Sequence, residues 1–304
     1  MRSLLLALAL ALTTVAVSGQ HWTVPRTPWG DPDLQGFWPS ADMLGVPLER
    51  PANRGERATL SDEEFAELPP QRRTPNANDA FFGESRAHWR EYGKPQRQTS
   101  LIVDPPNGRL PQLTAEGARR AATVPSEARG PLNGPEDASQ TARCLSRGTL
   151  GSMLPIGNSS GNQIIQAPGL VVIRNEMIHE ARLVHVDGRP HAGATVRGYM
   201  GDSRGWWDGD TLVVDTTNFR DRSGTGPNNL FSRDARLRER FVRVDRHTMS
   251  YEATVDDPST WTRPWTVAFP LTEDPSYYLF EFACHEGNNL SMRSMLGGAR
   301  LAEK

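Results

Sequence analysis

The chain has 304 residues, and its 34 Lys and Arg against 36 Asp and Glu give a formal net charge of -2. This balance excludes the strong basic excess of a nucleic-acid-binding protein, and a mean hydropathy of -0.55 excludes a protein with many membrane spans. The 27 Gly and 24 Pro exceed the usual share of roughly 12%, which favours a chain rich in turns over a helix bundle.

The first 19 residues are typical of a secretory signal peptide. Arg2 supplies a positive start, residues 3–17 are almost wholly apolar, and small residues precede an expected cleavage after Gly19. A membrane anchor is the alternative, but the apolar run is shorter than the roughly 20 residues that a spanning helix needs. We therefore expect a protein exported to the periplasm or the medium, without membrane attachment after cleavage.

Export bears on the two cysteines, Cys144 and Cys284. In an oxidising compartment two cysteines usually pair, so we expect a disulfide between them. Two separate buried thiols are the alternative.

Residues 20–156 are expected to form an extended arm, because they hold 17 of the 24 prolines and show little sustained periodicity. Short helices are expected at 61–68, where Ser61 and Glu64 fit a capping box, and at 114–120. Residues 99–104 are expected to form a short strand that prolines end. Many aromatic side chains in this part need burial, so the arm is predicted to pack on the rest of the chain.

Residues 157–304 are predicted to be a mainly β domain with a short C-terminal helix after residue 288. Turn signals such as Asp-Gly separate short strand-like runs, and short connections indicate antiparallel neighbours. We expect an antiparallel up-and-down barrel or a strongly curved meander sheet of the lipocalin type, with a β-sandwich as the alternative. The expected strands are 162–167, 170–174, 177–186, 211–217, 236–244, 248–255, 261–271 and 277–284.

Several longer motifs are shared with one group of proteins. The motifs are PWGDPDLQG at 28–36, SLIVDPP at 100–106, EMIH at 176–179, GDTLVVDTTNF at 209–219, TWTRPW at 260–265 and ACHEGN at 283–288. With them the chain resembles a family of exported bacterial proteins of unassigned activity. The resemblance implies export and implies no reaction.

No cofactor is expected, because the motifs that would hold one are missing from the sequence. It has no Gly-x-Gly-x-x-Gly, no phosphate-binding loop and no His-Glu-x-x-His pair. A metal site built from His179, His191 and His285 is kept as an alternative, since imidazole suits zinc, copper or iron.

A site in the barrel mouth is predicted from the faces of the expected strands. Glu239 lies between apolar neighbours on its face, and Trp261 and Trp265 flank Arg263. Two indoles can hold a flat ring, and a guanidinium between them can stabilise negative charge. A purely structural buried pair between Glu239 and Arg263 is the alternative.

His179 is predicted to be the general base of this site. Glu239, or else His285, would orient it or return the proton, and Arg182 on the opposite face of its strand would support substrate binding.

These residues lead to three hypotheses about function. The first is an exported enzyme, a lyase, isomerase or cyclase, that acts on a small ring-containing molecule by acid–base chemistry without a cofactor. The second is a lipocalin-like protein that only binds such a molecule, and the third is a histidine-based metal enzyme. The expected partner is a small molecule, with neither nucleic acid nor membrane, and the sequence leaves the oligomeric state open.

Overall fold

The computed structural model describes residues 22–70, 91–125, 132–140, 142–224 and 226–286, together with 288, 292, 293, 296 and 297. The expected signal peptide and most of the expected C-terminal helix lie outside the described residues. Within the described part, no helix is long and apolar enough to cross a membrane.

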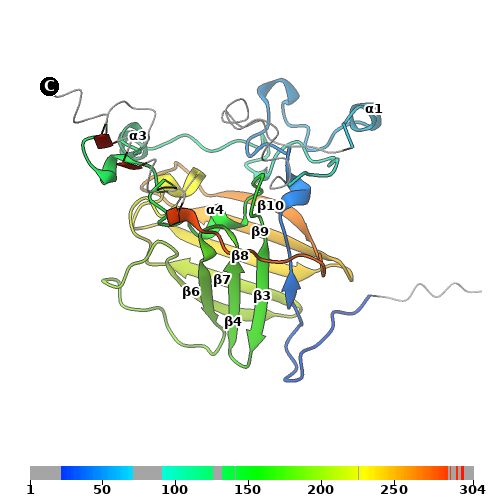
Figure 1. Ribbon diagram of the computed structural model, residues 1–304. Helices are drawn as coiled ribbons and strands as arrows, with labels where there is room; N and C mark the ends of the chain where they lie inside the picture. The colour runs from blue at the N-terminus through cyan, green and yellow to red at the C-terminus, as the bar shows by residue number, and fades with distance from the viewer. Residues whose placement is uncertain are drawn as a thin grey trace, which may run out of the picture.

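One curled sheet of ten strands forms a half-barrel, which confirms the mainly β, strongly curved fold (Figure 1). The strand order is β1-β3-β4-β5-β6-β7-β8-β9-β10-β2, so the strands from β3 to β10 follow one another as in a meander. Their bounds are β1 Gly36–Phe37, β2 Ile102–Asp104, β3 Asn162–Ala167, β4 Leu170–Asn175, β5 Ala181–His185, β6 Asp202–Asp208, β7 Thr211–Thr217, β8 Arg236–Arg243, β9 Thr248–Asp256 and β10 Trp265–Thr272.

The expectation of a purely antiparallel sheet is wrong at one place. Strands β5 and β6 pair in parallel, with Val184 opposite Ser203, while every other named pair is antiparallel. The long connection from 186 to 201 returns the chain to the end of the sheet where β5 began, which parallel pairing requires. Strand β6 was not expected from the sequence, because Gly205 and the adjacent Trp206 and Trp207 break its apolar alternation.

Three expected strands also differ from the structure. Residues 177–179 form a 3-10 turn, η6, and the strand begins only at Ala181. The strand expected at 261–271 begins only at Trp265, as β10, because residues 262–263 form a bend before Pro264. Residues 277–283 run as irregular chain without a strand partner among the described residues.

The interior of the half-barrel is packed with large side chains, so it is a core and not an open lumen. Alternate residues of each strand point inward, as strand geometry requires. The largest side chains that are fully buried are Trp38, Trp261, Trp265, Tyr251, Phe219, Phe231 and Phe241. Their edge-on contacts, such as 5.4 Å between the ring centroids of Trp261 and Trp265, leave no slot for a ring between them.

The N-terminal arm supplies both edges of the sheet. Its strand β1 pairs with β3, and its strand β2 pairs with β10. Between these edges, Leu34, Trp38 and Met43 enter the core with no exposed surface. The arm therefore shares one hydrophobic core with the sheet, while the boundaries predicted for it stay a prediction.

The short helices of the chain begin where capping residues predict. Helix α1, Asp62–Ala66, has the expected capping box of Ser61 and Glu64, and Thr114 caps helix α3, Ala115–Ala122. Among the described residues, further helical segments are α4 Thr149–Met153 and the 3-10 turns η1 Ala41–Met43, η2 Ala52–Arg54, η5 Pro135–Asp137, η6 Met177–His179 and η7 Gly226–Leu230.

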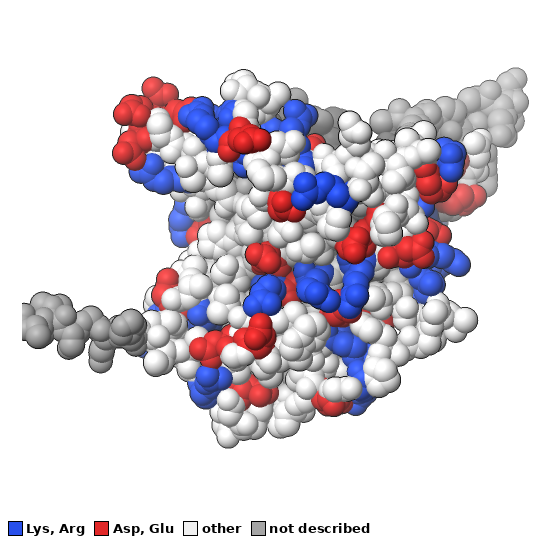
Figure 2. Space-filling view, turned by 180° about the vertical axis from the view of Figure 1, so that it is seen from behind, with Lys and Arg blue, Asp and Glu red and all other residues white. Residues whose placement is uncertain are grey.

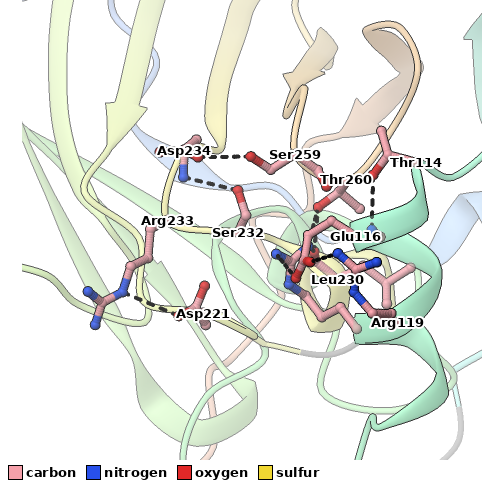
Figure 3. Close-up of polar contacts among 12 residues, drawn as sticks. Thr114, Glu116, Arg119, Asp221, Leu230, Ser232, Arg233, Asp234, Ser259 and Thr260 are labelled. Atoms are coloured by element: carbon pink, nitrogen blue, oxygen red, sulfur yellow. Dashed lines mark hydrogen bonds and ion pairs between the residues drawn. The ribbon is translucent and has the colours of Figure 1, made fainter.

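Helix α3 is fastened to the loop between β9 and β10 (Figure 3). Thr114 donates its hydroxyl to the carbonyl of Ser259 at 2.8 Å, and Arg120 donates to Oγ1 of Thr260 at 2.8 Å. Gly117 allows the close approach, since a Cβ there would lie 2.2 Å from the carbonyl oxygen of Thr260. These contacts attach the arm to the sheet a second time, close to the pairing of β2 with β10.

A buried ion pair crosses the interior. Arg182 of β5 binds Glu239 of β8 through two nitrogens, the second at 3.1 Å, and Tyr251 of β9 donates its hydroxyl to Glu239 at 2.9 Å. The side chains of Arg182 and Glu239 are 3% and 0% exposed. Every charge in this triad has a partner, which buried charges require.

Breaking this triad should be costly. Glu239→Ala leaves the Arg182 charge buried and alone, so we expect it to lower the free energy of unfolding by about 3–5 kcal/mol. The double variant Arg182→Met with Glu239→Leu should recover most of that loss. Urea unfolding at pH 7 measures both, and the exposed Arg263→Met serves as a control within about 0.5 kcal/mol. Equal stability of Glu239→Ala and the wild type would contradict a structural role for the pair.

Candidate functional site

The turn from 176 to 180, between β4 and β5, has a strained backbone. Ile178 and His179 adopt φ angles of 63° and 46°, in the left-handed region. This region is unusual for a β-branched residue such as Ile178, and each such residue costs about 1–3 kcal/mol that the surroundings must supply. The turn buries Met177 and Ile178 and exposes His179 to solvent.

Backbone hydrogen bonds hold the strained turn in place. The N–H of Asn175 donates to the carbonyl of Glu180 at 2.8 Å, and the N–H of His179 donates to the carbonyl of Glu176 at 2.9 Å. The N–H of Glu176 donates to the carbonyl of Gly161 at 2.9 Å. These bonds fix the backbone of the turn, in which His179 comes between Glu176 and Glu180 in the sequence.

Glu176 belongs to a hydrogen-bond network that includes Tyr277 and Glu91. Tyr277 Oη lies 2.7 Å from Oε1 of Glu91 and 2.7 Å from Oε2 of Glu176. A phenol has one hydrogen and can donate it to one carboxylate only, so the second contact needs a protonated carboxyl group. Burial raises the pKa of Glu176 above its usual range, against hydrogen bonds from Tyr277 and others that lower it.

Glu180 is a second carboxyl group that tends to hold its proton. Burial raises its pKa, although the hydroxyl of Ser146 donates to its Oε2 at 2.8 Å and the backbone of Arg147 also donates to it. Two carboxyl groups with raised pKa values, Glu176 and Glu180, therefore lie in the same turn as His179.

Chain segments far apart in the sequence converge on this turn. The disulfide between Cys144 and Cys284, confirmed in the structure, joins the segment before α4 to the C-terminal segment. A Cβ at Gly161 would lie 2.3 Å from the ring of Tyr277, so this position allows the C-terminal segment to approach the turn. We call this cluster the turn site, and define it by Glu91, Ser146, Glu176, His179, Glu180 and Tyr277.

The structure separates most of the residues that the sequence predicted as one site. His179 belongs to the turn site, whereas Glu239 and Arg182 form the interior ion pair described above. Trp261 and Trp265 are 1% and 0% exposed and contact each other.

The remaining predicted site residues lie at the surface. Arg263 is exposed and binds Asp104 at 3.0 Å, so the alternative pair of Arg263 with Glu239 is not formed. His285 is also exposed. Among the described residues, no hydrogen bond or ion pair joins His179 to Arg263, Glu239 or His285.

His191 lies in a separate cluster over β6 and β7. Its Nδ1 is 2.9 Å from Asp202, and its Nε2 is 3.2 Å from Asp215. Arg236 donates to Asp215 from two nitrogens, at 2.6 and 2.9 Å. Both ring nitrogens of His191 therefore lie within hydrogen-bond distance of a carboxyl group.

The histidines do not meet at a common point. Within the ranges that the structure describes, no group of three or more His, Cys, Asp or Glu residues is arranged to hold a metal ion. His191 is bonded to Asp202 and Asp215, and the alternative of a metal bound by His179, His191 and His285 receives no support from this geometry.

The carboxyl groups and the tyrosine of the turn site were not predicted from the sequence. A signal for part of it was present, since Glu176, His179 and Glu180 place three titratable residues within five positions. Glu91 and Tyr277 carry no such signal, because only the folded chain brings them to Glu176.

Comparisons of the chain with protein-family models, with curated proteins and with solved structures gave no match. The resemblance to a family of exported bacterial proteins stays a prediction.

The back of the molecule carries both signs of charge, interspersed over its surface (Figure 2). Exposed ion pairs also join opposite charges on the surface, such as Arg240 with Asp208 at 3.2 Å. Mixed charge of this kind does not resemble the basic patch that nucleic acid requires.

The protonation of Glu180 should make stability depend on pH. Its pKa is raised in the folded state, so its contribution to stability is complete below its unfolded pKa, near 4.5, and is lost as pH rises through the folded pKa. Glu180→Gln removes that loss, and we expect it to be more stable than the wild type at pH 7 by on the order of 1 kcal/mol. At pH 4 the two should be equal.

Urea unfolding at the two pH values measures this effect, and the exposed Glu281→Gln is the matched control, within about 0.5 kcal/mol of the wild type at both. A Glu180→Gln protein that is less stable than the wild type at pH 7 would contradict the expectation.

Asp215 should have the opposite pH dependence. Burial opposes its ionisation, but hydrogen bonds from Arg236 and His191 outweigh burial and lower its pKa below 3.8. Its contribution to stability is therefore present above its unfolded pKa and is lost as pH falls through the folded pKa. Asp215→Asn should cost about 1–3 kcal/mol at pH 7, and this difference should shrink below pH 3.

Unfolding midpoints measured from pH 2.5 to pH 7 check this expectation. Asp208→Asn, which removes an exposed ion pair, should cost less than about 1 kcal/mol at any pH. A pH-independent difference between Asp215→Asn and the wild type would show that the lost charge is not its cause.

Proposed function

We propose that the protein is an enzyme that moves protons on a small organic molecule, of the isomerase or lyase type, at the turn site. The observation that carries the proposal is the strained turn, which exposes His179 between Glu176 and Glu180. Strained, non-glycine backbone of this kind concentrates at functional sites. Two carboxyl groups with raised pKa values beside an imidazole supply both an acid and a base.

In this proposal His179 takes a proton from the substrate as general base. Glu180, which holds its proton above its usual pH range, returns one as general acid. His179, which is exposed, then releases its proton to solvent, and Glu180 takes up one proton in exchange, so both groups regain their starting states.

Aromatic side chains near the turn site suit a ring-containing substrate. The backbone N–H of Phe280 donates to Glu176, and the side chains of Tyr278 and Phe280 are 75% and 72% exposed. They offer an aromatic surface that Trp261 and Trp265, buried against each other, do not offer. Export is part of the proposal, and the disulfide supports it.

Deuterium exchange tests the proposal without knowledge of the substrate. Extracts of small molecules in D2O are incubated with the protein and followed by mass spectrometry. We expect the wild type to form new products or to cause mass shifts of one deuterium. The rate of this reaction should fall at least 100-fold in His179→Ala and about 10-fold or more in Glu180→Gln. His185→Ala, a half-buried histidine on β5 outside the turn site, should keep full activity.

Wild-type protein that changes no molecule, but retains one from the extract, would favour the binding-protein hypothesis. Equal exchange by His179→Ala and the wild type would contradict the role of His179.

A further inference from the structure

Arg147 is a buried cation without an ion-pair partner among the described residues. It is 8% exposed, and it donates from Nε and Nη2 to the carbonyl of Gly151 at 3.0 and 2.6 Å. Its Nη1 contacts only the sulfur of Met177, at 3.4 Å. Burial lowers the pKa of Arg147 to about 10, so the guanidinium stays charged at neutral pH.

An unpaired buried charge is costly, since its desolvation amounts to several kcal/mol. Arg182 shows how this protein balances such a charge elsewhere, with the carboxylate of Glu239. Arg50 in the arm also lacks a carboxylate, but it donates to the hydroxyl of Thr99 and to a carbonyl, and has no contact with the turn site. The position of Arg147 beside the turn is therefore what calls for an explanation.

Unpaired polar atoms surround the same short helix, α4. The Oδ1 of Asn228 accepts a hydrogen bond from the N–H of Gly151 at 2.9 Å. Its buried Nδ2 and the buried hydroxyl of Ser152 have no partner in the part of the chain that the structure describes. Native proteins pair nearly all such atoms, so two orphans next to an unpaired cation indicate a place for a polar ligand.

This place adjoins the turn site. Met177, which contacts Arg147, belongs to the strained turn, and Ser146, the neighbour of Arg147, donates to Glu180 at 2.8 Å. A group bound to Arg147 would thus lie beside the residues that carry the proposed proton transfer. Because the side chain of Met177 is flexible, a ligand can displace its sulfur from Nη1 of Arg147.

We propose that Arg147 binds the carboxylate of the substrate, which makes the substrate a small carboxylic acid. This inference rests on the proposed function. A guanidinium binds a carboxylate through two parallel hydrogen bonds, and a single negative charge matches the single unpaired cation. A phosphate dianion would need a second cation, and none contacts Arg147 among the residues described.

Benzoate is the probe, and benzamide is its neutral counterpart of the same shape. The folded protein, with its disulfide intact and its methionine methyl groups labelled with carbon-13, is titrated with each compound by NMR. Met177→Leu identifies the signal of Met177. We expect benzoate to shift this signal in a saturable way and benzamide to bind at least tenfold more weakly.

Variants locate the effect. Arg147→Lys and Arg147→Gln should weaken benzoate binding at least tenfold, while Arg263→Gln, at an exposed arginine, should leave it unchanged. The wild-type comparison of benzoate with benzamide keeps the test decisive if Arg147→Gln does not fold. Equal binding of the two compounds, no shift of Met177 with either, or a stronger effect of inorganic phosphate would overturn the inference.

The two proposals fail separately. His179→Ala should bind benzoate as the wild type does while losing deuterium exchange. Exchange without benzoate binding would reject the role of Arg147 alone, and benzoate binding without exchange would reject the proposed reaction alone.

Discussion

The ion pair between Arg182 and Glu239 constrains the whole half-barrel. The two residues stand on β5 and β8, with two strands between them in the sheet, and their side chains still meet in the core. A flat sheet would hold them about 15 Å apart, since neighbouring strands lie roughly 5 Å apart, so the sheet must curl for either charge to be paired. Because Arg182 comes two residues after Glu180, the same pair fixes the start of β5 and with it the end of the turn site.

The N-terminal arm pairs with both edges of the curled sheet. A half-barrel has two free edges, and unpaired edges invite association with other chains. The strands β1 and β2 cover these edges, and Trp38 closes the space between them, with its indole N–H donating to the carbonyl of Leu34 at 2.9 Å. Residues without a periodic pattern of their own can therefore be ordered, because their large side chains complete a core that the sheet provides.

The sequence predicts local structure well and long-range contacts poorly. Runs with clear alternation and flanking turns, such as 162–167 and 211–217, match β3 and β7 in full. Strand β6 escapes prediction because Gly205 and the adjacent Trp206 and Trp207 interrupt its alternation, and without this strand the parallel pair cannot be predicted. The same reason applies to the site: His179 could be chosen by residue type, whereas Tyr277 meets Glu176 only after the chain has folded across 101 positions.

Several energetically unfavourable features lie close together around the turn site, as is common at functional sites. Two residues in the left-handed region, two buried carboxyl groups and an unpaired guanidinium lie around α4 and η6. Their combined cost must be offset by structure that does not take part in the chemistry. The disulfide from Cys144 to Cys284, which closes a loop across 140 positions, contributes about 3–5 kcal/mol in the chain-entropy model. It joins the two segments that carry Ser146 and Tyr277 to the turn, so this covalent restraint acts where two residues adopt left-handed backbone angles.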